Sequence, residues 1–366
     1  MAIQTITIEG FKSIRELRDF PLDPEINILI GANGSGKSNF VKFVNFLAEI
    51  VSARLQHYVG ASGGAEQLFF MGSKETKCIV GEFGFPGHGY RFELAVNRRN
   101  ELFFSKEQFD LYDKVGHHWV TLDVGHRETM LRERFLEAKD IQVRYCLRDT
   151  VEQVSEIMVY HFHDTSDSAD VKKLHPITDN EALRFDARNL AAFLYNLKKN
   201  HLSVYEEIRD TVRLVAPFFG DFLLRPYFQN PNQIQLEWTQ KDSDIPFHGS
   251  QLSDGTLRFI CLVAALLQPS PPKTLLLDEP ELGLHPYALT ILSTLIYAAA
   301  RKSQLIVSTQ SADLLSCFEP HQVIVVERQG NESKFKRLDK AALQIWLDDE
   351  YSLGDLWRKN ILGGRP

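Results

Sequence analysis

The segment Gly31–Ser38, GANGSGKS, has the residue types and spacing needed to bind a chain of phosphates. It fits the pattern G-x-x-x-x-G-K-S/T without mismatch, follows the apolar run Ile26–Ile30, and precedes a helical pattern near Asn39. Its glycines let the backbone curl so that N–H groups and the helix N-terminus face the anion. We expect Lys37 to neutralise the β- and γ-phosphates and the Ser38 hydroxyl to bind Mg²⁺. The segment therefore predicts the phosphate loop of a nucleotide-binding site.

Two adjacent carboxylates follow a second apolar run, in the segment Leu275–Glu281, LLLDEPE. A buried strand would deliver them at its C-terminal edge, where ligands bind in open α/β sheets. We expect Asp278 to hold the Mg²⁺ shell and Glu279 to take the proton of the attacking water. Acids at a strand end are common, so this interpretation depends on the phosphate loop as its partner.

A third segment, Leu252–Thr256, LSDGT, stands directly before the apolar helical run Leu257–Leu267. Ser253 is a good helix N-cap, and this would be a purely structural role. The functional alternative is a second phosphate-binding helix N-terminus.

The order of these segments resembles the heads of ABC-type ATPases. After them comes the strand Leu305–Val307 followed by Ser308–Ser311, STQS, as in those heads. The chain is similar, more narrowly, to the SMC/RecF/OLD branch of stand-alone, DNA-linked and phage-defence ATPases. Its opening Ile8–Ile14, IEGFKSI, the Asn39 that trails the phosphate loop, and the pair His285-Pro286 carry this narrower resemblance.

The resemblance implies an α/β P-loop NTPase fold of ABC/SMC-head type, with a mixed central sheet, an antiparallel β subdomain and a helical insertion. It also implies ATP and Mg²⁺ as cofactors, and a head-to-tail homodimer or higher oligomer that closes around ATP. Ser253 and Gly255 of one subunit would contact the γ-phosphate held by the other. The residues implied in nucleotide binding are Gly31, Asn33, Gly34, Ser35, Gly36, Lys37, Ser38, Asn39, Ser253, Gly255 and Lys12. Ser38 and Asp278 are implied at the metal, and Glu279, Gln310 and Lys37 in catalysis.

Two positions depart from the family pattern. The switch position after Leu305–Val307 is often His, whereas this chain has Gln310. An amide can orient a water or touch a γ-phosphate but cannot carry a proton charge, so we expect slow hydrolysis. The glutamine that links Mg²⁺ to the helical region is the second departure, with Gln67 and Gln153 as candidates and neither favoured.

The run Tyr160–Asp164, YHFHD, raises the question of a metal cluster. His161 and His163 would share one face of a strand, because alternate residues do so, and Asp164 follows them. No further ligand is evident nearby, so we favour a structural or interface role over metal binding.

Three parts are predicted along the chain. Residues 1–105 form an N-terminal ATPase lobe with the phosphate loop and antiparallel strands, and residues 201–366 form a C-terminal lobe with the remaining motifs. Residues 106–200 form a mostly helical insertion, in which partner recognition is expected. Further short strands are expected near Phe222–Tyr227 and Gln233–Trp238.

Composition narrows the classes of partner. The 366 residues include 41 Lys and Arg against 48 Asp and Glu, a net charge of −7 that argues against a broad polycationic surface. DNA binding is therefore expected from the resemblance alone.

Four separated cysteines indicate neither a disulfide framework nor a zinc motif built on them. The longest apolar run, Phe259–Leu267, falls well below the roughly 18 residues of a membrane span, so we expect a cytoplasmic protein without membrane attachment.

The leading hypothesis is a slow ATPase that dimerises around ATP and regulates or loads a partner, in DNA repair or anti-phage defence. OLD-type nucleases carry a Toprim domain after the ATPase, and the residues after Val326 leave no room for one. We therefore expect a separately encoded effector, a nuclease or toxin. Two alternatives stay open: an ATP-gated sensor with little turnover, and the nucleotide-binding subunit of a transporter.

Overall fold

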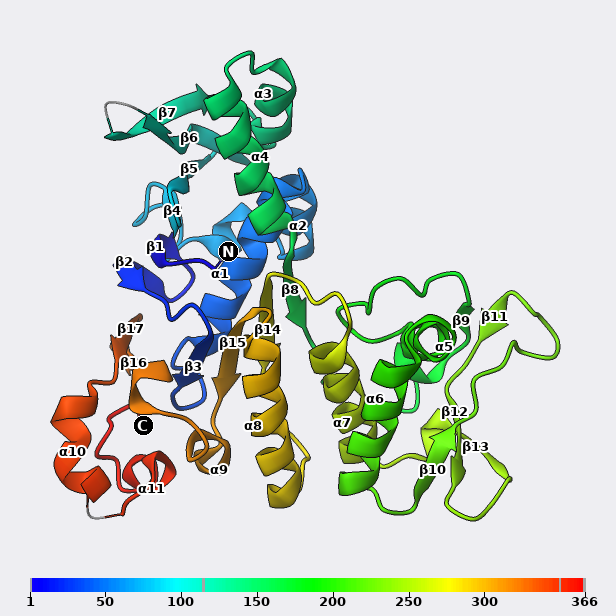
Figure 1. Cartoon of the computed structure of the whole chain (residues 1–366). Helices are drawn as coiled ribbons and strands as arrows, with labels where there is room; N and C mark the ends of the chain where they lie inside the picture. The colour runs from blue at the N-terminus through cyan, green and yellow to red at the C-terminus, as the bar shows by residue number, and fades with distance from the viewer. Residues whose placement is uncertain (1, 114–115, 349, 365–366) are drawn as a thin grey trace.

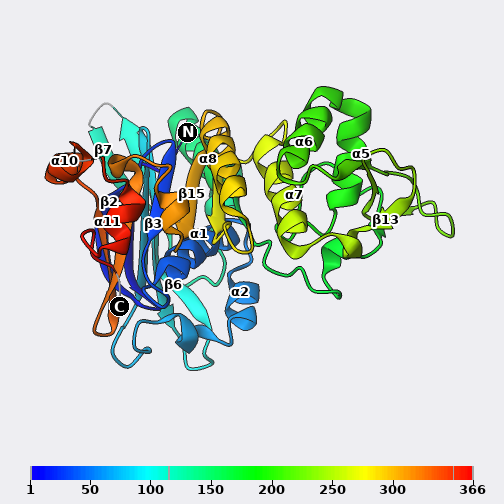
Figure 2. The same cartoon turned by 90° about the horizontal axis from the view of Figure 1, so that it is seen from below.

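The computed structural model describes residues 2–113, 116–348 and 350–364 (Figure 1). It comprises a central sheet, an antiparallel sheet above it in Figure 1, and a helical lobe to one side. Figure 2 shows the helical lobe beside the central sheet, where helix α7 (Asp254–Leu267) contacts helix α8 (Pro286–Ala300).

The central sheet is mixed and carries the chemistry-bearing segments. Its strands, in spatial order, are β17 (Glu332–Arg337), β16 (Val323–Gln329), β3 (Ile26–Ile30), β15 (Gln304–Thr309), β14 (Thr274–Asp278) and β8 (Ile157–Tyr160). All neighbours pair in parallel except β17, which is antiparallel to β16. Every residue of β3 and β15 is buried, as expected of parallel strands that are covered on both faces. This mixed sheet confirms the predicted fold class.

The register of the parallel strands aligns their carboxyl ends. Asp278 is paired with Ser308, and Leu277 with Tyr160. Thr309 is paired with Ile30, which directly precedes the phosphate loop. The residues that follow β3, β15, β14 and β8 therefore reach one edge of the sheet.

The second sheet is antiparallel throughout. Its strands, in spatial order, are β2 (Ile14–Pro21), β1 (Thr5–Phe11), β4 (Ile79–Phe85), β5 (His88–Val96), β6 (Leu102–Asp113) and β7 (Gly116–Asp123). It confirms the predicted antiparallel β subdomain.

Helix α1 (Lys37–Val51) is the packing element that joins the two sheets. It contacts β8, β14 and β15 of the central sheet and β1 of the antiparallel sheet, and ten of its residues are buried. Phe43 lies on its antiparallel-sheet side, with ring centroids 5.0 Å from Phe11 and 5.8 Å from Phe83. Aromatic pairs of this kind contribute about 0.5–1.5 kcal/mol each beyond the burial of their area. The phosphate loop is thus followed by a helix that is held on both sides.

Other helices cover the sheets and the chain ends. They are α2 (Leu55–Ala61), α3 (Leu131–Glu137), α4 (Ile141–Ser155), α8 (Pro286–Ala300), α9 (Ala312–Leu315), α10 (Lys340–Asp348) and α11 (Leu353–Arg358). Within the described residues, no helix is long and apolar enough to cross a bilayer.

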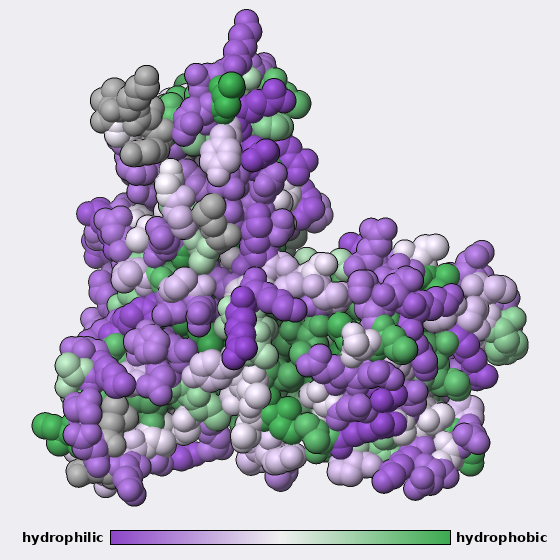
Figure 3. Space-filling model, viewed as in Figure 1, coloured by the Kyte–Doolittle hydropathy of each residue, from purple (hydrophilic) through white to green (hydrophobic). Residues whose placement is uncertain are grey.

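The helical lobe forms around three helices and a small three-stranded sheet. Its elements are α5 (Leu190–Asn200), α6 (Leu202–Val215), α7 (Asp254–Leu267), β9 (His175–Pro176), β10 (Phe219–Phe222), β11 (Gln233–Ile234), β12 (Glu237–Gln240) and β13 (Pro246–His248). Trp238 anchors the sheet, with its ring 5.8 Å from Phe219 and 5.0 Å from Phe247. On the face seen in Figure 3, hydrophobic residues gather where this lobe meets the central sheet.

Secondary structure departs from the expectation in three places. Strand β6 runs across the expected boundary at residue 105, and β8 takes residues from the expected helical insertion into the central sheet. With only four residues, β8 is too short for its periodicity to identify it. The strand expected near Phe222–Tyr227 ends at Phe222, and this segment contains Pro226, which cannot donate to a sheet ladder. The division into three parts stays a prediction.

Candidate functional site

The phosphate loop connects β3 to α1 in a conformation that requires glycine. Gly34 and Gly36 have φ angles of 77° and 112°, which L side chains rarely adopt. A Cβ atom at Gly36 would lie 2.1 Å from the Ser333 hydroxyl oxygen. Lys37 donates through Nζ to the carbonyl oxygens of Gly31, at 2.7 Å, and Ala32, at 3.1 Å. The loop is therefore closely packed around its own lysine.

Three polar side chains support this loop from below. Ser333, on β17, donates to the carbonyl oxygen of Ser35 at 2.6 Å, and its hydroxyl lies 2.8 Å from that of Ser13. Asn39 donates to the Ser13 hydroxyl at 2.7 Å. Sequence reasoning missed Ser333, because it comes from a strand some 300 residues away along the chain and belongs to no motif.

An open pocket of about 390 Å³ lies over the loop. Its lining residues are Asn33, Gly34, Gly36, Lys37, Ser38, Asn39 and Glu279. Burial lowers the pKa of Lys37, and the carboxylates of Glu279 and Asp278 oppose that shift. Six of the predicted nucleotide-binding residues and the predicted catalytic base thus line one pocket, whereas Gly31 and Ser35 lie in the loop beneath it.

Ser38 and Asp278 come together although 240 positions separate them in sequence. The Ser38 hydroxyl lies 3.4 Å from Asp278 Oδ1, and the Ser308 hydroxyl also donates to Oδ1. Hydroxyl and carboxylate oxygens are the donors that Mg²⁺ prefers. The residues present therefore fit a magnesium ion next to a phosphate held by the loop.

Glu279 and Gln310 form a direct pair. The Gln310 side-chain amide donates to Glu279 Oε1 at 2.5 Å. Glu279 has a φ of 46°, unusual for a residue with a side chain, and its backbone N–H donates to the Ser308 carbonyl at 2.8 Å. Strain of this kind persists where the surrounding structure imposes it. The amide at the switch position thus holds the carboxylate that faces the pocket.

Glu281 ties β14 to the end of β15, a role that sequence reasoning did not assign. Its Oε1 accepts from the Thr309 hydroxyl at 2.6 Å and from the Gln310 backbone N–H at 2.8 Å. Its Oε2 is buried and has no hydrogen-bond partner among the described residues. Burial is the largest cause that raises the pKa of Glu281, and the Glu279 charge adds to it.

Ser253 caps the N-terminus of helix α7, as the sequence predicts. Its hydroxyl accepts from the Thr256 backbone N–H at 3.2 Å. Ser253 is exposed, and neither it nor Gly255 lines the pocket over the phosphate loop of the same chain. A Cβ atom at Gly255 would lie 2.4 Å from the Gly283 carbonyl oxygen, so this helix start packs closely against the segment after β14.

Lys12, Gln67 and Gln153 do not line this pocket. Lys12 donates through Nζ to the Gln67 carbonyl at 3.3 Å, on the turn between β1 and β2. Gln153 is buried in α4, and its amide lies 3.4 Å from Asp149. None of the three is among the residues that line the pocket.

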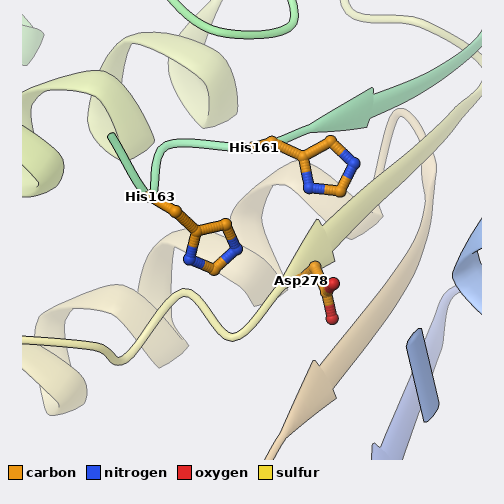
Figure 4. Close-up of side chains that lie close together, drawn as sticks. All are labelled: His161, His163 and Asp278. Carbon is orange, nitrogen blue, oxygen red and sulfur yellow. The ribbon is translucent and has the colours of Figure 1, made fainter. Parts of the chain in front are cut away.

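Two histidines, His161 and His163, lie beside Asp278. His161, His163 and Asp278 each offer a ligand atom, and these atoms all lie within 4.8 Å of one another (Figure 4). Burial lowers the pKa of His161. Asp164 is absent from this group and instead accepts from the Ser166 hydroxyl at 2.7 Å. The third member therefore comes from the neighbouring strand β14, and only parallel pairing of β8 with β14 could have identified it in advance.

Comparison with known families identifies the chain. Residues 26–316 match the family described as "AAA domain, putative AbiEii toxin, Type IV TA system", and this range contains the whole of the site except Lys12, Ser13 and Ser333. The chain belongs to this family. Together with the relatives below, the match makes it an ABC/SMC/RecF-like ATPase, as the sequence motifs predict.

Curated relatives match over short segments. The DNA replication and repair protein RecF of Renibacterium salmoninarum is 33% identical over 78 residues, 20% of this chain and 18% of RecF. Structural maintenance of chromosomes protein 2 of Gallus gallus is 40% identical over 74 residues, 18% of this chain and 6% of that protein. The chain thus spans less than a fifth of either relative.

Among solved structures, an SMC head bound to the C-terminal winged-helix domain of ScpA aligns with a TM-score of 0.60. The alignment covers 93% of this chain and 99% of that one at 17% identity. The likeness confirms the SMC-head fold.

Gly36→Ala should weaken ATP binding at least tenfold, because the new methyl group collides with Ser333 and the backbone has a φ of 112°. Gly60→Ala is the matched control, since its Cβ would meet nothing within 4 Å on the exposed face of α2. Isothermal titration with ATP and Mg²⁺ measures both affinities. Wild-type affinity in a folded Gly36→Ala protein would contradict the assignment of the loop.

Glu281→Gln should change how stability depends on pH. Burial raises the pKa of Glu281 above 4.5, so the stability from its proton is present below about pH 4.5 and is lost as pH rises through the folded-state pKa. The variant keeps an acceptor for Thr309 and Gln310 but does not titrate. Its Tm minus that of wild type should therefore increase as the pH rises above about 4.5 and through the folded-state pKa of Glu281. A difference independent of pH would show that Glu281 stays ionised throughout this range.

Proposed function

We propose that this chain binds and slowly hydrolyses ATP, dimerises head to tail around the nucleotide, and thereby regulates or loads a separate effector. The observation that carries this proposal is that Ser38 and Glu279 line the pocket over the phosphate loop. Asp278 lies at hydrogen-bond distance from Ser38, and Gln310 donates to Glu279. Binding, metal coordination and water activation then share one site.

Each residue has a distinct role in the proposed reaction. Backbone N–H groups of the loop and the Lys37 ammonium bind the β- and γ-phosphates. Ser38 and Asp278 would hold Mg²⁺, which when bound neutralises charge on the phosphates. Glu279 accepts the proton of the attacking water, and its carboxylate already faces the pocket.

The contact between Gln310 and Glu279 favours slow ATP hydrolysis over ATP binding without hydrolysis. Its amide donates to Glu279 at 2.5 Å and so orients the base, but it cannot carry a proton charge. A sensor that only binds ATP would have no need for a base held in this way. Active turnover is therefore the proposed function, at a low rate.

A dimer accounts for the placement of Ser253 and Gly255. Both stand at the N-terminus of α7, in the helical lobe, and neither lines the pocket of its own chain. The N-terminus of a helix is suited to anions. We propose that each subunit presents this helix to the γ-phosphate bound by its partner, so that ATP occupancy closes the dimer and hydrolysis opens it.

The proposed partners follow from the names of the relatives. The family description includes a putative toxin of a toxin–antitoxin system, and the RecF relative is named for DNA replication and repair. We propose a separately encoded nuclease or toxin as the effector, DNA as a possible ligand, and a cytoplasmic role in DNA repair or anti-phage defence.

Glu279→Gln tests the proposal. ATP turnover should fall about 10²–10⁴-fold because the variant lacks the base, while ATP affinity stays near that of wild type. Phosphate release and light scattering after gel filtration, with and without duplex DNA, measure turnover and oligomer size together. The variant should accumulate as an ATP-stabilised dimer.

Two control variants sharpen the result. Glu207→Gln removes an exposed carboxylate from α6 and should leave turnover unchanged. Ser253→Asn keeps a good N-cap for α7 but replaces the hydroxyl, and in the Glu279→Gln background it should prevent ATP-dependent dimerisation without loss of ATP binding. If Glu279→Gln hydrolyses ATP like wild type, Glu279 is not the base. If ATP never changes the oligomer, the shared-site dimer is wrong.

A further inference from the structure

We infer that His161, His163 and Asp278 form a binding site for a transition-metal dication of the Zn²⁺ class. Their ligand atoms all lie within 4.8 Å of one another at the carboxyl-terminal edge of the central sheet. Figure 4 shows both imidazole rings and the carboxylate grouped at this edge, the histidines on the segment after β8 and Asp278 at the end of β14. This site differs from the magnesium site that Ser38 and Asp278 would form, because two of its three ligands are imidazole nitrogens.

The parallel pairing of β8 with β14 places the two histidines near Asp278. Tyr160 is paired with Leu277, so His161 follows β8 beside the residue that follows Leu277. The intervening Phe162 is buried. His161 and His163 both bring a ligand atom close to the Asp278 carboxylate, as Figure 4 shows.

Hydrogen bonds hold the segment in this position. The His161 backbone N–H donates to the Phe185 carbonyl at 2.8 Å. Arg258, which is 9% exposed on α7, donates to the carbonyl oxygens of Phe162 at 2.9 Å and His163 at 3.2 Å. The backbone that carries both rings is therefore anchored from two sides.

The donor set selects the class of metal. Two imidazoles and one carboxylate suit Zn²⁺, Co²⁺, Ni²⁺ or Cu²⁺, whereas Mg²⁺ prefers oxygen ligands alone. Three protein ligands leave a fourth position open, as in catalytic rather than structural zinc sites. A small cavity whose lining includes His163, Asp278 and Glu279 adjoins the cluster.

Geometry requires a small closure of the site. Ligand atoms around a tetrahedral zinc ion, with bonds of about 2.0–2.1 Å, are roughly 3.3 Å apart. The present spread of up to 4.8 Å is wider, so the ligand atoms must approach one another by up to about 1.5 Å. His163 is exposed and its side chain is free to turn inward, whereas His161 is half-buried.

Occupation of this site would affect the nucleotide site through Asp278. Both hydrogen bonds from Ser38 and Ser308 are accepted by Oδ1, so we assign Oδ2 to the transition metal. A dication there would oppose a second dication at Oδ1 by charge repulsion. We therefore expect the transition metal and the magnesium–ATP complex to compete. This competition rests on the proposed function, but metal binding itself does not.

Cobalt titration of the untagged, nucleotide-free full chain tests the site. Co²⁺ bound by two imidazoles and a carboxylate in a four-coordinate site gives visible absorption bands that hexa-aqua Co²⁺ lacks. Wild type should bind one Co²⁺ per chain, Zn²⁺ should displace it, and Mg²⁺ alone should not. His163→Ala should weaken binding at least tenfold, and so should His161→Ala.

Control variants and outcomes separate this site from surface binding. His57→Ala and His201→Ala replace exposed histidines and should leave Co²⁺ affinity unchanged. His163 is exposed, so His163→Ala should fold even if His161→Ala does not. Equal Co²⁺ affinity in wild type and His163→Ala would overturn the inference, and so would the absence of stoichiometric binding. If Co²⁺ binds but ATP does not, the metal site stands and the proposed ATPase function fails.

Discussion

Parallel pairing of four strands in one register is the constraint on which the candidate site depends. β3, β15, β14 and β8 end together, so the phosphate loop, Gln310, the Asp278–Glu279 pair and His161 meet at one edge. A slip of one residue in any pair would turn every side chain of that strand to the opposite face. Burial on both faces of β3 and β15 makes such a slip costly.

Hydrogen-bond donors from β15 and from Gln310 hold the three carboxylates at this edge in place. Asp278, Glu279 and Glu281 lie within four positions, and each has a hydroxyl or amide donor from β15 or the residue after it. These donors offset part of the repulsion among the three acids. One oxygen of Glu281 is buried with no hydrogen-bond partner in the described part of the chain, and burial raises the pKa of this carboxyl group.

The helical lobe reaches the same edge through Arg258. Its guanidinium donates to the carbonyl oxygens of Phe162 and His163 after β8 and of Leu282 after β14. A single side chain on α7 thus contacts both segments that flank Asp278. The helical lobe and the edge that carries Asp278 are therefore joined by a direct contact, and helix α7 also carries Ser253.

Local sequence motifs made much of the candidate site predictable. The phosphate loop, the acidic strand end and the N-cap at Ser253 each combine a short pattern with a flanking element, and the structure has all three where the sequence predicts them. Ser333, Arg258 and the partnership of His161 with Asp278 were not predictable in this way. They depend on strand order and on contacts between segments distant in sequence, which no local periodicity encodes. The short strand β8 was missed for the same reason.

An experimental structure with Mg²⁺ and a non-hydrolysable ATP analogue would test the central claim most directly. We expect the γ-phosphate at Lys37, the metal between Ser38 and Asp278, and Glu279 facing the γ-phosphate with Gln310 beside it. We also expect Ser253 of a second subunit to close the same pocket. A nucleotide bound elsewhere, or bound in this pocket with Ser38 and Asp278 on separate sides of it, would contradict the account.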